Sequence, residues 1–211
     1  MLTKRTIDHI VYAVPDLDDA MEWFTSRTGI SPVFGGHHKK QGTKNALVNL
    51  GNACYLELLA TDEENQAIAP PRWMGIDLLK EARVTRWALK SERLVKDALV
   101  LESHQPELGT VRSGQRKTNT GVLLQWGMTM PRAEPLIEVV PFMTDWSASS
   151  HHPTDQLPAA CQFLDIEVAH PDPQSIQPVF TELGLNLMVH SSKDISIKVV
   201  IETPKGVVEL V

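Results

Sequence analysis

One histidine and three glutamates stand out because each interrupts an apolar, strand-like run. His9 lies in "IDHIVYAV", and Glu57 lies between two leucines in "YLELL". Glu138 in "LIEVV" and Glu209 in "VVELV" repeat the arrangement. A carboxylate is costly to bury unless it is paired or bound to a cation. The recurrence indicates either a site where these groups bind a cation or move a proton, or ordinary hydrogen-bonded pairs and glutamates on a solvated sheet face.

The alternation of side chains around His9 shows which neighbours share its face. In a strand, successive side chains point to opposite sides, so His9 shares a face with Val11 and Ala13. An imidazole on an apolar face either forms its hydrogen bonds inside a core or points into a cavity.

The elements that carry these residues repeat along the chain. After the first strand, "PDLDDAMEWFTSRTGI" predicts a helix capped by Asp16 and stopped at Gly29, and three strands follow. Residues 165–181 match residues 9–25 at a constant offset of 156, again followed by three strands. A fainter copy lies between them and ends with "PLIEVVPF" as its last strand. The sequence therefore predicts three βαβββ units, at about residues 5–60, 82–144 and 160–211.

These units predict an α+β protein. Residues 1–145 would form one domain from the first two units, because adjacent units usually pack together, and residues 160–211 would pack on it or form a dimer contact. Pairing of the first and third units is the alternative, and it would bring Asp165 and Glu209 to His9 and Glu57. A unit without an intramolecular partner also predicts a homodimer through its open sheet edge.

Composition narrows the function classes. The net charge of −6 and the isoelectric point near 5.7 argue against a nucleic-acid surface. The chain has no apolar run of membrane-spanning length, and its start lacks the apolar core of a signal peptide, so we expect no membrane partner and a cytoplasmic protein. Cys54 and Cys161 have no metal-type spacing, and we expect both to be reduced.

Several segments of the first unit carry a family likeness. The stretches "DHIVYAVPDLDDA", "GISPVFGGHH", "GTKNALVNLG" and "YLELLA" resemble the glyoxalase-like proteins of the vicinal oxygen chelate superfamily, strongly over residues 6–60 and moderately afterwards. The resemblance implies that two βαβββ units pair so that their curved sheets enclose an open cleft. It also implies that residues from the first and last strands of each unit often hold a divalent metal. Members include isomerases, lyases, dioxygenases, thiol transferases and metal-free proteins that sequester drugs.

The resemblance implies a small-molecule ligand and a set of site residues. A divalent metal (zinc, nickel, manganese, magnesium or iron, which the residues do not distinguish) would be bound by His9, Glu57 and Glu138. Glu57 and Glu138 would be the catalytic groups of a lyase or isomerase that acts through an oxyanion or enediolate. The alternative is a metal-free binding protein. The candidates for ligand contact are Asn45, Tyr55, Trp126 and His38, with His152 as a further candidate at the cleft rim.

Overall fold

The computed structural model describes residues 5–118, 121–159 and 161–211. The first unit comprises β1 (Ile7–Ala13), α1 (Leu17–Thr28), β2 (Val33–His38), β3 (Thr43–Asn49) and β4 (Tyr55–Thr61). The second comprises β5 (Arg83–Lys90), α2 (Leu94–His104), β6 (Val111–Lys117), β7 (Leu123–Thr129) and β8 (Phe142–Asp145). The third comprises β9 (Gln162–His170), α3 (Pro173–Leu183), β10 (Val189–Ser191), β11 (Ser196–Thr203) and β12 (Gly206–Leu210). Short 3-10 helices are η1 (Trp73–Leu78), η2 (Pro106–Gly109) and η3 (Pro153–Gln156).

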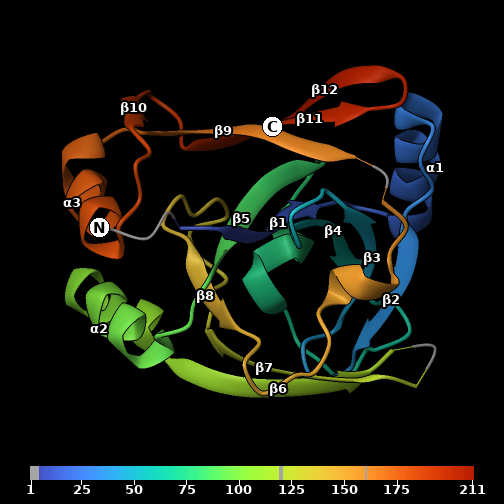
Figure 1. Ribbon diagram of the computed structural model, residues 1–211, viewed down its shortest axis with the longest axis horizontal. Helices are drawn as coiled ribbons and strands as arrows, with labels where there is room; N and C mark the ends of the chain where they lie inside the picture. The colour runs from blue at the N-terminus through green and yellow to red at the C-terminus, as the bar shows by residue number, and fades with distance from the viewer. Residues whose placement is uncertain (1–4, 119–120, 160) are drawn as a thin grey trace.

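The described strands form two sheets. Eight strands in the order β2-β3-β4-β1-β5-β8-β7-β6 make the larger sheet, and β10-β9-β11-β12 make the smaller one. The larger sheet is strongly curled (Figure 1). At its centre β1 and β5 pair antiparallel, so the first two units share one curved sheet. The α+β fold of repeated βαβββ units and the predicted pairing of the first and second units are confirmed.

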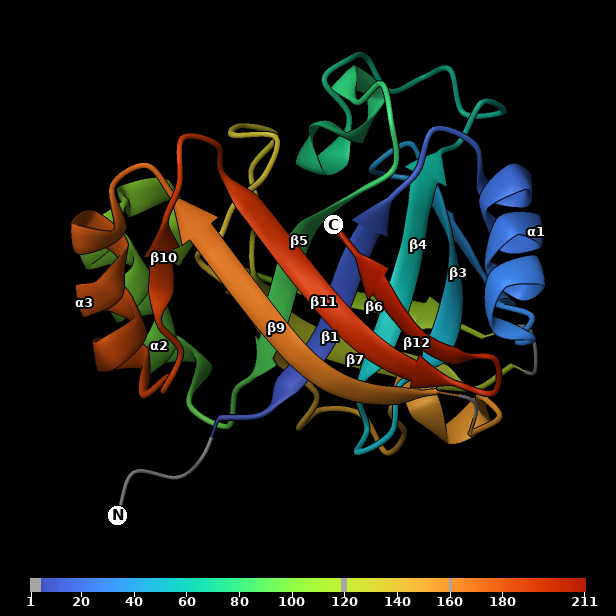
Figure 2. The ribbon, with the colours of Figure 1, turned by 90° about the horizontal axis from the view of Figure 1, so that it is seen from above.

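The third unit packs against the convex, outer face of the large sheet. In Figure 2, β9 and β11 cross over β1, β4 and β5. The buried face of the small sheet, which includes Ile166 and Val199, shares one apolar core with Ile10 and Leu56. Asp165 and Glu209 are exposed. The alternative in which these two carboxylates meet His9 and Glu57 is therefore wrong.

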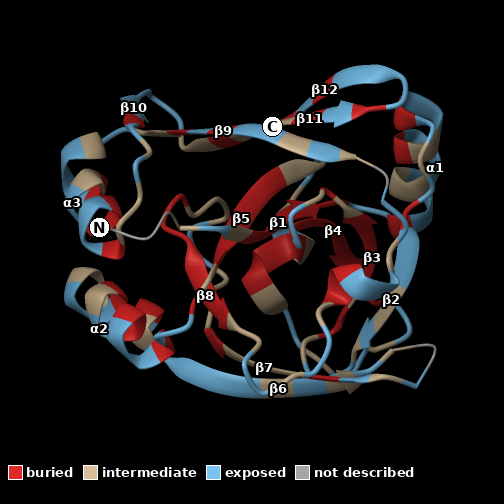
Figure 3. Cartoon of the chain, in the orientation of Figure 1, coloured by how far each residue is buried: buried red, intermediate tan, exposed pale blue. Residues whose placement is uncertain are grey.

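Strand β1 separates two apolar clusters. Its outward side chains Ile10 and Tyr12 belong to the large core beneath the third unit, whereas Val11 and Ala13 belong to a smaller cluster on the inner face. Figure 3 shows that the central strands between these clusters are buried along most of their length. The alternation predicted for this strand is therefore confirmed, and the inner face is the one that carries His9.

Helix α1 begins and ends where the sequence predicts. Asp16 caps it by accepting a hydrogen bond from the Asp19 backbone amide, and Gly29 ends it at φ 79°, a conformation that favours glycine. Helix α3 extends past Pro178 without an interruption. No helix in the described ranges is long and apolar enough to cross a membrane.

One segment differs from the prediction. Residues 135–141 do not form a strand, and the last strand of the second unit is β8, which begins at Phe142. Pro135 and Pro141 bracket this segment, and proline removes backbone N–H groups that a central strand needs. The polar linker after β4 also does more than connect units, because η1 places Met74 and Ile76 in the inner apolar cluster. This insertion fills one end of the curved sheet.

Candidate functional site

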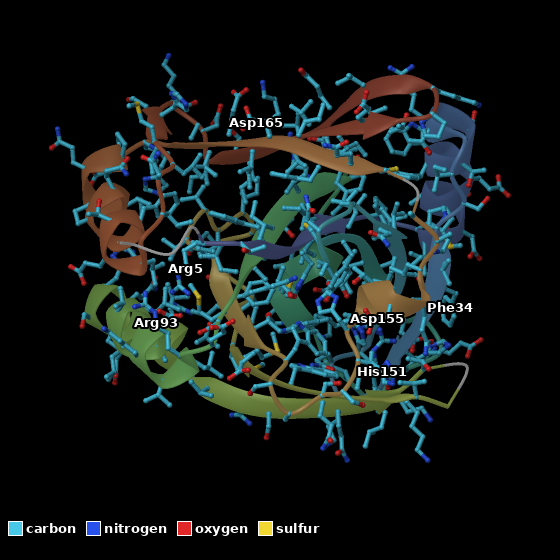
Figure 4. All side chains as sticks on the ribbon, viewed as in Figure 1. Arg5, Phe34, Arg93, His151, Asp155 and Asp165 are labelled. Carbon is cyan, nitrogen blue, oxygen red and sulfur yellow. The ribbon has the colours of Figure 1, made fainter. Side chains whose placement is uncertain are left out.

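The inner face of the large sheet lines a cavity of about 780 Å³. Side chains from β1, β2, β3, β4, β6 and β7 contribute to it, together with Trp146 and Pro153 from the segment after β8. Pockets of this size bury most of a small organic molecule. In Figure 4, Asp165 lies on the small sheet, away from this interior.

His9 lies on this inner face between two carboxylates. Its Nδ1 is 2.7 Å from Oδ2 of Asp8, and its Nε2 is 4.0 Å from Oε2 of Glu57. The ring stacks on Tyr55, with centroids 4.7 Å apart and an interplanar angle of 14°. Only 5 % of His9 is exposed, so contacts on several sides hold the imidazole in place.

Asp8 is the residue that fixes His9. An irregularity in the pairing of β1 with β5, between Ile7 and His9, lets Asp8 reach its neighbour although adjacent strand residues normally point apart. Besides His9, Nε1 of Trp146 and Nε2 of His152 donate to its Oδ1, at 3.0 and 3.1 Å. Burial raises the pKa of Asp8, but the hydrogen bonds from His152 and His9 outweigh it and lower the pKa to about 2.

The ionised Asp8 determines the tautomer of His9. A carboxylate only accepts hydrogen bonds, so the proton of neutral His9 lies on Nδ1 and the lone pair lies on Nε2. The tautomer of His152 is fixed in the same way. Its Nδ1 accepts a hydrogen bond from the Thr154 backbone amide, so its proton lies on Nε2, which donates to Asp8. The unprotonated nitrogen of His9 is thus the atom that faces Glu57.

Glu57 is held by Asn45 from the neighbouring strand. Nδ2 of Asn45 donates to Oε1 of Glu57 at 2.6 Å, which leaves Oε2 as the oxygen nearest to His9. Asn45 itself lies against Gly35, where an added Cβ would be 2.3 Å from its Oδ1. A glycine at this position of β2 therefore makes room for the amide.

Six aromatic rings form a continuous wall, and four of them, Trp126, Trp146, Tyr55 and His9, line the cavity. Each ring contacts the next at centroid distances between 4.7 and 5.8 Å. The wall consists, in order, of Trp126, Trp146, His152, Tyr55, His9 and Phe142. Burial, and then the charges of Asp8 and Glu57, raise the pKa of Tyr55 well above its usual range, so its hydroxyl remains a proton donor.

The remaining candidates for ligand contact also border the cavity. His38 lies on the inner side of β2, where its Nδ1 is 2.8 Å from Oγ1 of Thr43, and burial lowers its pKa. Its neighbour His37 is paired with Asp62. Trp126 packs so closely over Gly114 that a Cβ there would lie 2.6 Å from the indole. Their contacts with a ligand stay predictions.

Glu138 lies apart from this group. It lines a separate small pocket with Arg86, and its Oε1 accepts a hydrogen bond from the Val140 backbone amide. Arg86 is buried there and donates to the carbonyls of Thr85 and Leu136, among others. The expectation that Glu138 joins His9 and Glu57 is wrong, because the prolines around it prevent the strand that would have carried it inward.

The donor set does not fit a metal held by both units. His9 and Glu57 are two possible ligands, and the Asp8 contact on the far nitrogen is common behind metal-bound histidines. On the second unit, however, Ala88 of β5 is the register partner of His9, and the inner positions of β8 hold Phe142 and Thr144. Across the described residues, no three His, Cys, Asp or Glu side chains gather in a way that could hold an ion.

Sequence reasoning missed the role of Asp8 and of Trp146. Simple alternation places Asp8 on the opposite face from His9, and the strand irregularity that brings them together has no signal in a single sequence. Trp146 lies in a polar segment that reads as a linker. One clue was present, because an acidic residue that begins an apolar run beside a histidine is costly to bury without a partner.

Comparison with known proteins identifies a family for this chain. The family model described as a glyoxalase-like domain matches residues 7–184. A hypothetical protein from Staphylococcus aureus has a similar structure, with 16% identity and a TM-score of 0.65 over 96% of this chain and 97% of that chain. This likeness concerns the fold.

Two enzymes have more distant structural similarity. Mycobacterium tuberculosis methylmalonyl-CoA epimerase has 21% identity and a TM-score of 0.41, covering 66% of this chain and 86% of that chain. A Streptomyces coelicolor methylmalonyl-CoA epimerase variant in complex with 2-nitronate-propionyl-CoA has 20% identity and a TM-score of 0.43, covering 71% of this chain and 99% of that chain. No curated protein sequence matches this chain.

Proposed function

Because this chain belongs to the glyoxalase-like family, we propose that its cleft binds a small organic molecule and that His9 removes a proton from it. One observation carries the proposal. Asp8 holds His9 so that the unprotonated Nε2 lies 4.0 Å from Glu57 beside a cavity of about 780 Å³. A general base that a third group orients is the arrangement that proton transfer needs.

The reaction class follows from the groups around His9. A proton leaves a carbon next to a carbonyl group and binds to Nε2, while the C–H electron pair moves into the carbonyl and leaves an enolate oxyanion. The Asp8 and Glu57 carboxylates stabilise the imidazolium that forms. The Tyr55 hydroxyl, which burial keeps protonated, supplies a hydrogen-bond donor for the oxyanion. Return of the proton to another position gives an isomerase, and loss of a leaving group gives a lyase.

A binding protein without chemistry is the second candidate. The wall of aromatic rings favours it, since aromatic side chains hold planar or apolar ligands without any reaction. The two candidates differ in whether a bound carbonyl compound exchanges its protons.

Proton exchange tests the proposal. We expect the protein to catalyse exchange of the benzylic protons of phenylpyruvate with D₂O, followed by ¹H NMR. His9→Asn keeps a donor for Asp8 but removes the base, and it should slow the catalysed exchange by about 100-fold or more. His190→Asn is the matched control because His190 is exposed on β10, outside the cleft. Exchange that is equally fast in wild type and His9→Asn would overturn the proposal, and binding without exchange would favour the second candidate.

A further inference from the structure

Most of the charged side chains that line the cavity are basic, whereas the protein as a whole is acidic. Among the described residues that line it, three charged side chains are basic, Lys39, Lys40 and Arg116, whereas Glu57 is acidic. The chain as a whole has a net charge of −6. A local excess of positive charge in a concave, partly apolar site concentrates anions there.

Arg116 is positioned by the fold. It belongs to β6, one edge of the large sheet, and its Nη1 donates to the Gly35 carbonyl oxygen on β2, the other edge. The contact bridges the two edges of the curled sheet. Arg116 is two residues from Gly114, which pairs with Trp126, so the guanidinium shares a face with the start of the aromatic wall.

The three basic side chains at the cavity form no ion pair with a carboxylate of the described residues. The ion pairs of the described residues include none with Arg116, Lys39 or Lys40, whereas nearby Lys44 binds Glu63 at 2.9 Å. The residues outside the described ranges contain no aspartate or glutamate. Guanidinium nitrogens that do not contact Gly35 are therefore available to an external anion, and their planar fork suits carboxylate and phosphate oxygens.

We propose that the cleft selects an organic acid. Its carboxylate or phosphate binds Arg116, with Lys39 and Lys40 from the β2–β3 turn adding positive charge, and its apolar or aromatic body lies along the ring wall toward His9. The inference deepens the proposed function by naming the substrate class, and it rests on that function for the reaction at His9. The anion site itself does not require the reaction.

Two probes of nearly the same shape test the charge requirement. Phenylpyruvate carries a carboxylate, whereas phenylacetone has the same ring and carbonyl without it. We expect phenylpyruvate to bind the wild-type protein at least tenfold more tightly, by ligand-observed NMR titration. Raising the salt concentration from 50 to 500 mM should weaken phenylpyruvate binding and leave phenylacetone binding unchanged.

Substitutions at neighbouring residues of β6 test whether the anion binds at Arg116. Arg116→Gln should weaken phenylpyruvate binding at least tenfold without changing phenylacetone binding, and Arg116→Lys should lose less because it keeps the charge. Lys117→Gln removes the same charge from the next residue, which is exposed and does not line the cavity, and should have no effect. Circular dichroism checks that each variant is folded.

The outcomes separate this inference from the proposed function. Equal binding of the two probes, absence of binding, or phenylpyruvate binding that Arg116→Gln leaves intact would each overturn the organic-acid site. Phenylpyruvate binding that requires Arg116, combined with proton exchange that His9→Asn does not slow, would support the anion site and overturn the role of His9.

Discussion

Asp8 is fully buried, and three donors surround its carboxylate. His9, His152 and Trp146 each direct an N–H group at it, which compensates for the loss of water. These donors come from β1 itself and from the segment after β8, so a single carboxylate connects the first unit to the segment that follows the second. The same group fixes the tautomer of His9. Stability and the proposed chemistry therefore depend on one side chain.

The ionised state of Asp8 predicts a pH-dependent stability. Its pKa in the folded protein is about 2, below the usual 3.8, so its contribution is fully present above pH 4 and is lost as the pH falls toward 2. A shift of this size corresponds to roughly 2 kcal/mol. We expect Asp8→Asn to lower the free energy of unfolding by about that amount at pH 7, measured by urea denaturation, and the difference from wild type to shrink below pH 4.

Asp194→Asn is the control for this experiment. Asp194 is exposed in the turn between β10 and β11, and its side chain lies outside the network around His9. The substitution should leave the free energy of unfolding within about 0.5 kcal/mol of wild type. A difference between wild type and Asp8→Asn that stays constant from pH 7 to pH 3 would contradict the assignment.

At the scale of elements, the close approach of neighbouring strands determines how the Glu57 carboxylate is positioned. Gly35 on β2 lies against Asn45 on β3, and Asn45 in turn holds Glu57 on β4. Three neighbouring strands thus position one carboxylate. The close contact between β2 and β3 exists because residue 35 lacks a Cβ.

Gly35→Ala should disturb this chain of contacts. The new Cβ would lie 2.3 Å from Oδ1 of Asn45, so the amide must move and its bond to Glu57 weakens. Overpacking of this kind costs about 1–3 kcal/mol in the free energy of unfolding. Combining Gly35→Ala with Asn45→Ala should cost less than the sum of the two single changes, since the clash is gone. If urea denaturation shows that the losses in free energy of unfolding of the two single variants add up to that of the double variant, the two residues do not compete for space.

Element prediction from the sequence succeeded where a pattern was local. Helix α1, its caps and the alternation of β1 follow from Asp16, Gly29 and the apolar spacing. The repeat predicted the three βαβββ units, and the adjacency of the first two predicted that they pair. Glu138 was misplaced because its apolar neighbours read as a strand, whereas Pro135 and Pro141 break the ladder. The contacts of Asp8 with Trp146 and His152 join positions more than 130 residues apart, which no local pattern reveals.

At the scale of the whole molecule, the third unit covers the outer face of the curved sheet. Its buried strands share a core with β1, β4 and β5, and Phe180 of α3 contacts Trp87 of β5. The site lies on the opposite, inner face. The third unit therefore supports the sheet that positions the site without contributing Asp165 or Glu209 to it.

If the protein forms the predicted homodimer, the open edges of the small sheet are where a second copy would pair. The apolar face of the third unit is already covered within the chain, and the unpaired edge strands are β10 and β12. Val207 on β12 is 58% exposed, and an apolar side chain on an open edge favours pairing with a second copy. We expect a dimer by light scattering at micromolar concentration and a monomer for Val207→Lys. A monomeric wild-type protein would reject the prediction.

Deletion of residues 160–211 tests the proposed division into a two-unit domain, residues 1–145, and an added third unit. The curved sheet keeps its β1–β5 pairing and its inner cluster in the shortened chain, but Ile10, Leu56 and Trp87 lose their cover. Exposed apolar faces of this kind promote association. We therefore expect a fragment with β-sheet circular dichroism that binds a hydrophobic dye and self-associates in size-exclusion chromatography. A fragment that is wholly unfolded would show that the third unit is an integral part of a single domain, because the paired units then cannot form without the core they share with it.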